Sequence, residues 1–233
     1  MAKKGPNHAF RPLFDIPAHY TIPRTGTKLV EIAQHLDYVM QQVAVETVRA
    51  DSNSTLHCLP SVGIPCSGSL QTPELIEEIL VENTKSPAAH EFRLGRALLL
   101  LEKKVPQKQI VRERSIDVFT DAHPHIGKTV MANQFEYLLA ADDAYDFLEI
   151  RVLPKTADEE TLKDHSGYMI FNHNDGRYPN TFATLERPNK DSSIVDQLQQ
   201  QHANAHVQQA FDIALSPEES RDWLRTTAAK WQQ

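Results

Sequence analysis

The segment that most constrains the fold is the run Phe147-Leu-Glu-Ile-Arg-Val-Leu-Pro154. Apolar and charged residues alternate in its first half, which predicts a β-strand with one buried face. Its second half is apolar, and Pro154 ends the strand because proline cannot donate to a strand ladder. An amphipathic helix is predicted before it, over 129–141, and a second strand after it, over 168–171. This order of helix, strand, loop and strand indicates that a sheet forms the centre of the chain.

Capping patterns place several of the remaining helices. A hydroxyl followed by proline, the arrangement of a helix start, occurs at Thr72-Pro73, Ser86-Pro87 and Ser216-Pro217. Glu219 stands three residues after Ser216, which is the pattern of a capping box. Apolar spacing predicts further helices over 27–50 and 194–215, strands over 109–116 and 181–186, a short helix at the end of 109–116, and a loop over 51–71.

These elements predict an α+β protein with a small mixed or antiparallel sheet of about three to five strands, and with helices before and after the sheet. Four prolines precede residue 27, so residues 1–50 are predicted to form an N-terminal extension made of an extended arm and the first helix. Residues 51–233 are predicted to form a single α+β domain.

Composition excludes several classes of protein. The chain has 233 residues, of which 40% are hydrophobic and 24% charged, and this balance is typical of globular domains. A formal net charge of -7 argues against specific DNA binding by the chain itself. No signal peptide or membrane-spanning segment is recognised, so we expect a cytoplasmic protein without membrane contact. Cys58 and Cys66 are expected as free thiols, although a disulfide between them is geometrically conceivable.

Several short motifs follow one another in an order that resembles a known family. They are Ile64–Glu74 with Gln71, Arg93-Leu-Gly-Arg96, Val111-Arg-Glu113 with Ile116, Val130–Phe135 with Gln134, Leu148–Pro154 with Arg151, Gly167–Phe171, Thr184-Leu-Glu186 and Ala214–Ser220. Together they resemble the large C-terminal domain of the antitoxin-like helix-turn-helix transcriptional regulators common in actinobacteria.

The resemblance implies an effector- or partner-binding domain. In that family the domain usually follows a helix-turn-helix, which needs at least two packed helices. Only one helix is predicted before residue 51 here, so we expect a stand-alone member without the DNA-binding half.

Two arginines give the first candidate site. Arg93 and Arg96 lie three residues apart on a predicted helix and can share a face. Their guanidinium groups suit a carboxylate or phosphate, although pairing with Glu113 or Glu186 is an equally good explanation. If these acids share the cavity, the set suits a zwitterionic ligand. Side chains from the resembling motifs complete the candidate ligand-binding set: Gln71, Gln134, Arg151 and Glu186.

Histidine chemistry gives the second candidate. His165 lies in Asp164-His-Ser-Gly and could act as a general acid or base, although the same composition is typical of a turn. His123 and His125 lack a nearby thiol or carboxylate in zinc spacing, so no metal site is predicted. No glycine-rich phosphate loop or dinucleotide fingerprint occurs, and no cofactor is expected.

Two functions therefore remain open. The first is a domain that binds a small molecule or a protein partner. The alternative is a cofactor-free acyl or aminoacyl transferase with His165 and Glu113 as its catalytic residues. Its donor would be an activated ester, such as an aminoacyl-tRNA, which needs only positioning and one base. A homo-oligomer is compatible with either function.

Overall fold

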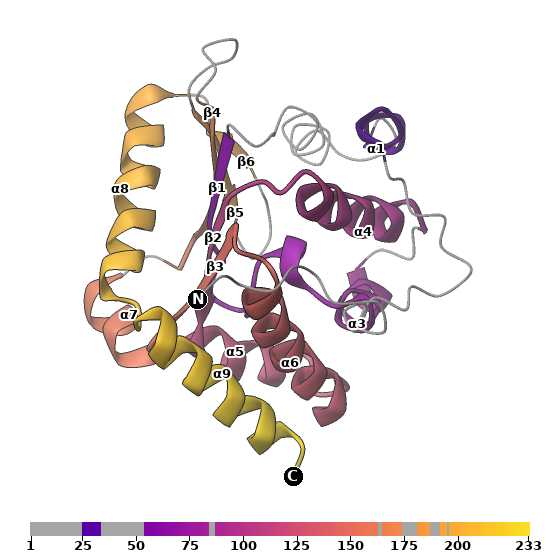
Figure 1. Ribbon diagram of the computed structural model, residues 1–233, viewed down its shortest axis with the longest axis vertical. Coiled ribbons are helices and arrows are strands. Elements are labelled where there is room, and N and C mark those ends of the chain that lie inside the picture. The colour runs from indigo at the N-terminus through magenta and orange to yellow at the C-terminus, as the bar shows by residue number, and fades with distance from the viewer. Residues whose placement is uncertain are drawn as a thin grey trace.

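A six-stranded mixed sheet divides the protein into two helical layers (Figure 1). The structure is a computed structural model, and it describes residues 25–33, 54–83, 87–162, 165–173, 181–186, 192–194 and 196–233. The strand order is β3 (Leu148–Leu153), β2 (Gln107–Arg112), β1 (Ser54–Leu59), β4 (Gly167–His173), β5 (Thr181–Glu186) and β6 (Ser192–Ile194).

The sheet has a parallel half and an antiparallel half. Strand β2 pairs in parallel with both β1 and β3, whereas β4, β5 and β6 continue the sheet from β1 in antiparallel pairs. Parallel strands need crossover connections, and helices supply them between β1 and β2 and between β2 and β3. The two crossovers contain η3 (Gly68–Leu70), α3 (Pro73–Asn83), α4 (Pro87–Glu102), α5 (Glu113–Ala122) and α6 (Lys128–Ala144).

Each face of the sheet has its own apolar core. On one face, Ile150 and Val152 are buried with Phe135 of α6 and Leu224 of α9 (Pro217–Trp231). A second cluster on the same side joins β1 to α4 and to α1 (Gly26–Ala33) through Leu29. The opposite face packs against α7 (Lys155–Thr161) and α8 (Gln197–Ile213). The period-two alternation of the strands therefore supplies both cores.

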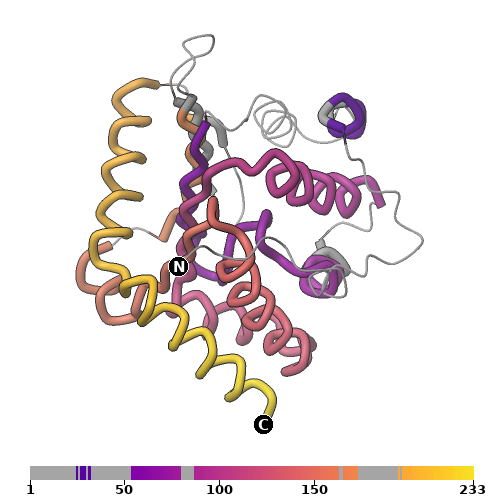
Figure 2. The backbone as a smooth tube through the Cα atoms, in the orientation of Figure 1, coloured from indigo at the N-terminus to yellow at the C-terminus, as the bar shows by residue number. Residues whose placement is uncertain are grey.

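Strand β3 is at the edge of the sheet, and its outer side is covered by side chains of α6 and α9 and by the segment leading into α9. The backbone N–H of Ile150 donates to Asp142 Oδ1 at 3.1 Å, and that of Val152 donates to Ser220 Oγ at 3.0 Å. The N–H of Leu215 donates to the Val152 carbonyl at 2.9 Å. Figure 2 shows α6 and α9 side by side next to this strand. Unpaired edge groups promote strand pairing between molecules, and here they have partners.

The α+β class, with a mixed sheet and helices on both of its faces, is confirmed. The strand at 147–154 appears as β3, and 109–116 divides into β2 and α5 as predicted. The capping box is also confirmed, because Ser216 Oγ accepts from the Glu219 N–H while Glu219 Oε2 accepts from the Ser216 N–H. Cys58 and Cys66 are buried and are not joined by a disulfide, as expected.

Three local predictions were wrong. The predicted loop 51–71 contains β1, and residues 192–194 form β6, so the sheet has six strands where three to five were expected. Helix α8 begins at Gln197 because Asp196 caps it, accepting from the Gln199 N–H at 2.9 Å. The loop after Pro154 contains the short helix α7. Most of the predicted arm and first helix, residues 1–24 and 34–53, lies outside the described residues.

Candidate ligand-binding site

The C-terminal edge of the parallel strands is filled by a buried ion pair. Arg112, at the end of β2, donates to Asp158 of α7 through Nε at 2.9 Å and Nη2 at 2.8 Å. Its Nη1 donates to the carbonyls of Pro60 and Ser166. Both charged side chains are fully buried. Ligands of parallel sheets usually bind at this edge, but here Arg112 joins four segments of chain across it.

The two candidate catalytic residues lie near this closed edge and have structural contacts. Glu113 Oε2 accepts from the Lys155 N–H at 2.8 Å, which stabilises the start of α7, and its Oε1 accepts from Trp223 Nε1 at 3.4 Å. His165 is exposed, and its Nδ1 lies 3.5 Å from Nη2 of Arg114. Its neighbour Asp164 lies outside the described residues.

Three of the candidate ligand-binding residues meet around η3, on the other side of the molecule from α8. Arg96 is buried on α4 with its guanidinium 5.7 Å from the Phe92 ring, and a Cβ added to Gly68 would lie 3.0 Å from its Nη2. The amide of Gln71 donates to the Cys66 carbonyl at 3.4 Å. Gln134 accepts from the Thr72 N–H and donates to the Leu70 carbonyl, both at 2.8 Å.

Hydrogen bonds tie this segment to the sheet. Ser67 Oγ donates to Gln109 Oε1 at 2.7 Å, and Gln109 Nε2 donates to Gln107 Oε1 at 2.9 Å. Ser69 adds contacts to both Ser67 and Gln109. These side chains are almost fully buried, and buried polar groups need such partners. The network therefore anchors the 66–72 segment between α4, α6 and β2.

The rest of the predicted set is dispersed. Arg93 is half-buried on α4. Arg151 lies on the α8 face of β3, where its Nε donates to Glu149 Oε1 at 2.6 Å. Glu186 ends β5, in register with Gly167, and its side chain is outside the described part of the chain. The structure thus brings Gln71, Arg96 and Gln134 together, and it places Glu113, His165 and Arg151 elsewhere.

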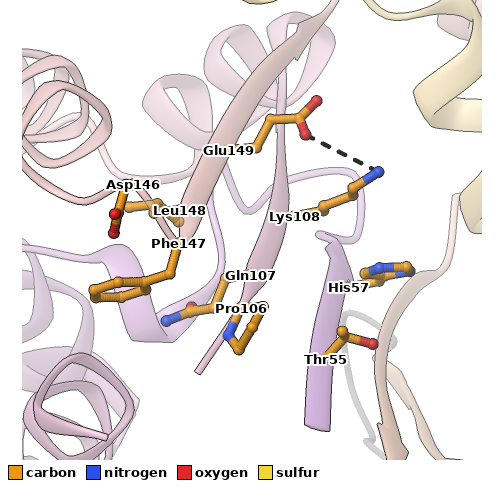
Figure 3. Close-up of a pocket in the computed structure, with 9 residues that line it drawn as sticks. All are labelled: Thr55, His57, Pro106, Gln107, Lys108, Asp146, Phe147, Leu148 and Glu149. Carbon is orange, nitrogen blue, oxygen red and sulfur yellow. Dashed lines mark ion pairs between the residues drawn. The ribbon is translucent and has the colours of Figure 1, made fainter. Parts of the chain in front are cut away.

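A pocket of about 190 Å³ opens at the opposite, N-terminal edge of the three parallel strands (Figure 3). Residues at the start of each strand line it, so it follows directly from the parallel pairing of β1, β2 and β3. The lining is Thr55, His57, Pro106, Gln107, Lys108, Asp146, Phe147, Leu148 and Glu149.

One wall of the pocket is a row of polar side chains on three adjacent strands. In the parallel register, His57 of β1 pairs with Lys108 of β2, and Lys108 pairs with Glu149 of β3. The Lys108 ammonium lies 4.0 Å from Glu149 Oε2 (Figure 3). Neighbouring strands lie about 4.8 Å apart, so residues in register place their side chains together.

His57 is held in its neutral form. Burial lowers the pKa of its imidazole, the positive charge of Lys108 lowers it further, and Glu149 raises it by a smaller amount. The ring also packs against Phe211 of α8, with 6.1 Å between the ring centroids. At neutral pH, His57 therefore offers the pocket one N–H donor and one nitrogen acceptor.

This row was not predicted from the sequence, since the sequence predicts a loop over 51–71 and β1 lies there. The signal was present: Leu56 and Cys58 alternate with Thr55 and His57, which is the pattern of a strand with one apolar face. Which residues of β2 and β3 would lie beside His57 depends on the register, and one sequence alone does not give it.

The fold and pocket define the class of protein as an α+β domain with a small pocket, polar on one wall, at one end of its sheet. The family model described as "Domain of unknown function (DUF5753)" matches residues 53–226, and the chain belongs to this family. No curated protein matches the chain, and no solved structure matches it either.

Two further classes of site are absent from the described part of the chain. Within the ranges given above, no helix has the length and hydrophobicity required to cross a bilayer. In the same part of the chain, no group of three or more His, Cys, Asp or Glu side chains is arranged to hold a metal ion.

Proposed function

We propose that this chain is a small-ligand-binding domain and that the pocket at the N-terminal edge of β1, β2 and β3 is its binding site. The observation that carries the proposal is the polar row of His57, Lys108 and Glu149 on the pocket wall. A small number of convergent polar groups beside apolar walls is typical of ligand sites. The resemblance to the effector domain of antitoxin-like regulators supports the same function.

The size of the pocket limits the ligand. Sites for drug-sized molecules usually measure roughly 300–1,000 Å³. A pocket of about 190 Å³ suits a molecule of about the size of an amino acid. This favours a small metabolite over a protein partner as the occupant.

The transferase alternative has less support. Both carboxylate oxygens of Glu113 accept hydrogen bonds, one from the Lys155 N–H and one from Trp223 Nε1. These contacts hold its side chain at the edge of the sheet opposite the pocket. His165 belongs to the opposite edge of the sheet, after α7. The two candidate catalytic residues therefore lie apart from the cavity in which a small acceptor would bind.

The proposal is tested by screening a library of small metabolites against the purified chain by ligand-observed NMR. We expect at least one compound to bind, and Thr55→Tyr to abolish its signal because the larger ring fills the pocket. The matched control is Lys230→Gln, an exposed position on α9, which leaves binding unchanged.

Circular dichroism and the urea midpoint establish that the Thr55→Tyr variant is folded. A screen without any bound compound would contradict the proposal. Binding that Thr55→Tyr leaves intact would instead assign the ligand to another place on the protein.

A further inference from the structure

Two cations form ion pairs with Glu149 beside the pocket, and the pair made by Lys108 is the longer one. Arg151 Nε lies 2.6 Å from Glu149 Oε1, whereas Lys108 Nζ lies 4.0 Å from Glu149 Oε2. Glu149 is therefore neutralised mainly by Arg151. The side chain of Lys108 is half exposed, and an exposed ion pair at this distance contributes little to stability.

Neutral hydrogen-bonding groups lie on the same side of the strands as this ammonium. Thr55 and His57 are two residues apart on β1, so their side chains share a face of the sheet, and His57 is in register with Lys108. Figure 3 shows Thr55, His57 and Lys108 extending from adjacent strands to one side. The hydroxyl and the neutral imidazole can each donate a hydrogen bond to an anionic oxygen.

The other side of the pocket is apolar. Pro106 lies at the entrance to β2, and Phe147 precedes β3 with its ring extending away from Lys108 (Figure 3). Tyr145 packs on the Phe147 ring, with 5.1 Å between the centroids, which fixes the position of that wall. A ligand that spans the pocket would meet a cation at one end and an apolar surface at the other.

We propose that the pocket binds a small monocarboxylate with an apolar or aromatic body, whose carboxylate is held by Lys108, Thr55 and His57 and whose body contacts Pro106 and Phe147. This inference rests on the proposed ligand-binding function and names its ligand class. A charge-assisted hydrogen bond to Lys108 supplies the selectivity for an acid. The second charge of a dianion such as a phosphate ester would be repelled by the carboxylate of Asp146, which lines the same pocket.

Isothermal titration calorimetry with matched compounds tests the ligand class. Phenylacetate is the probe, phenylacetamide is its neutral counterpart, and phenyl phosphate is the dianion. We expect phenylacetate to bind about tenfold or more tightly than either of the others, because only its single carboxylate forms charge-assisted hydrogen bonds without a second negative charge. Equal affinity for the acid and the amide would overturn the inference, and so would tighter binding of the phosphate.

Two substitutions test the role of Lys108. Lys108→Gln is expected to weaken phenylacetate binding about tenfold or more, whereas Lys108→Arg retains the positive charge and most of the affinity. Lys230→Gln again serves as the control. Unchanged affinity in Lys108→Gln would overturn the inference.

A spectroscopic readout separates direct contact from a structural effect. An anion beside the imidazole favours its charged form, so phenylacetate is expected to raise the pKa of His57, measured by NMR titration with His57→Gln to assign the signal. If this pKa does not change when phenylacetate binds, the placement of the carboxylate is wrong. Should the metabolite screen find a neutral or cationic ligand that Thr55→Tyr abolishes, the ligand class fails while the binding function stands.

Discussion

Gly167 lies where the start of β4 passes very close to another segment of backbone. A Cβ at this position would lie 2.2 Å from the Ser61 nitrogen and 2.9 Å from the Leu59 carbonyl oxygen. The crossing brings the start of β4 against the end of β1, beside the buried guanidinium of Arg112. Backbone atoms cannot move aside as a flexible side chain can, so only glycine fits here.

We therefore expect Gly167→Ala to lower the free energy of unfolding by about 3 kcal/mol or more, measured by urea denaturation. Gly127→Ala is the matched control, because nothing lies within 4 Å of a Cβ at that position and its φ is -66°. The control should change the free energy by less than about 1 kcal/mol. A similar small effect at Gly167 would show that the crossing relaxes.

His57 makes stability depend on pH in a defined direction. Its pKa in the native state lies below the ordinary value of 6.5. Above pH 6.5 the imidazole is neutral in both states, and below it the unfolded chain binds a proton that the native protein does not. The free energy of unfolding should therefore fall as the pH decreases from 6.5 through the native pKa.

His57→Gln is expected to reduce this acid sensitivity, measured from urea midpoints between about pH 7.5 and pH 5. The exposed His202 on α8 supplies the control substitution, His202→Gln, which should retain the acid sensitivity of the unsubstituted protein. A constant difference between the unsubstituted protein and His57→Gln across the range would contradict the assignment.

At the scale of elements, helices α6 and α9 cover the edge of strand β3. Ser220 of α9 is fully buried, and its hydroxyl accepts from the Val152 N–H and donates to the Leu215 carbonyl. Asp142 of α6 accepts from the Ile150 N–H and forms an ion pair with Arg221 at 2.7 Å. One strand is thus held by residues of two helices.

Replacing Ser220 by alanine leaves the Val152 N–H buried without its acceptor. We expect Ser220→Ala to cost about 1–3 kcal/mol of unfolding free energy, which chemical denaturation measures. On the same helix, Thr226→Ala removes an exposed hydroxyl and should cost less than about 0.5 kcal/mol. Equal effects of the two substitutions would mean that water replaces the Ser220 hydroxyl.

At the scale of the whole molecule, helix α9 covers one face of the sheet and the edge of β3. It packs along α6, Leu224 and Ala228 belong to the core on that face, and Trp223 reaches back to Glu113. The segment before it pairs with β3 through Leu215. The last helix therefore completes both the core and the sheet edge.

A chain that ends at Leu215 should lose cooperative unfolding and self-associate, because the truncation exposes apolar surface of α6 and the edge of β3. Thermal melting and analytical ultracentrifugation measure the two effects. Removing only Gln232 and Gln233 is the control and should preserve the folded monomeric or oligomeric state of the full chain. A cooperative truncated protein would show that α9 is dispensable.

Which side chains of the candidate site lie together could not be predicted from the sequence. Gln71 and Gln134 were related in the sequence only because both stand in resembling motifs. Their contacts with the backbone of one segment, Gln71 with the Cys66 carbonyl and Gln134 with Leu70 and Thr72, depend on the fold. Glu113, one of the two acids considered as partners for the arginines of α4, contacts Lys155 and Trp223 instead, because it starts α5 at the far end of β2.

The sequence by itself determined the elements whose signals are local. Alternation in 147–154, the Ser216–Glu219 capping box and the division of 109–116 depend on residues a few positions apart, and all three are present in the structure. These patterns were sufficient for the α+β class. A short stretch of sequence distinguishes a helix from a strand because the side chains on one face repeat at different intervals in the two structures.

The tertiary structure alone decided which strands are neighbours and in what register. His57, Lys108 and Glu149 are separated by about fifty and forty residues in sequence, yet the parallel pairing of β1, β2 and β3 places them in one row. In this sheet the buried pair of Arg112 and Asp158 fills the C-terminal edge of the parallel strands, and the pocket lies at their N-terminal edge. Register is fixed by packing over the whole sheet, so the pocket became visible only in the folded chain.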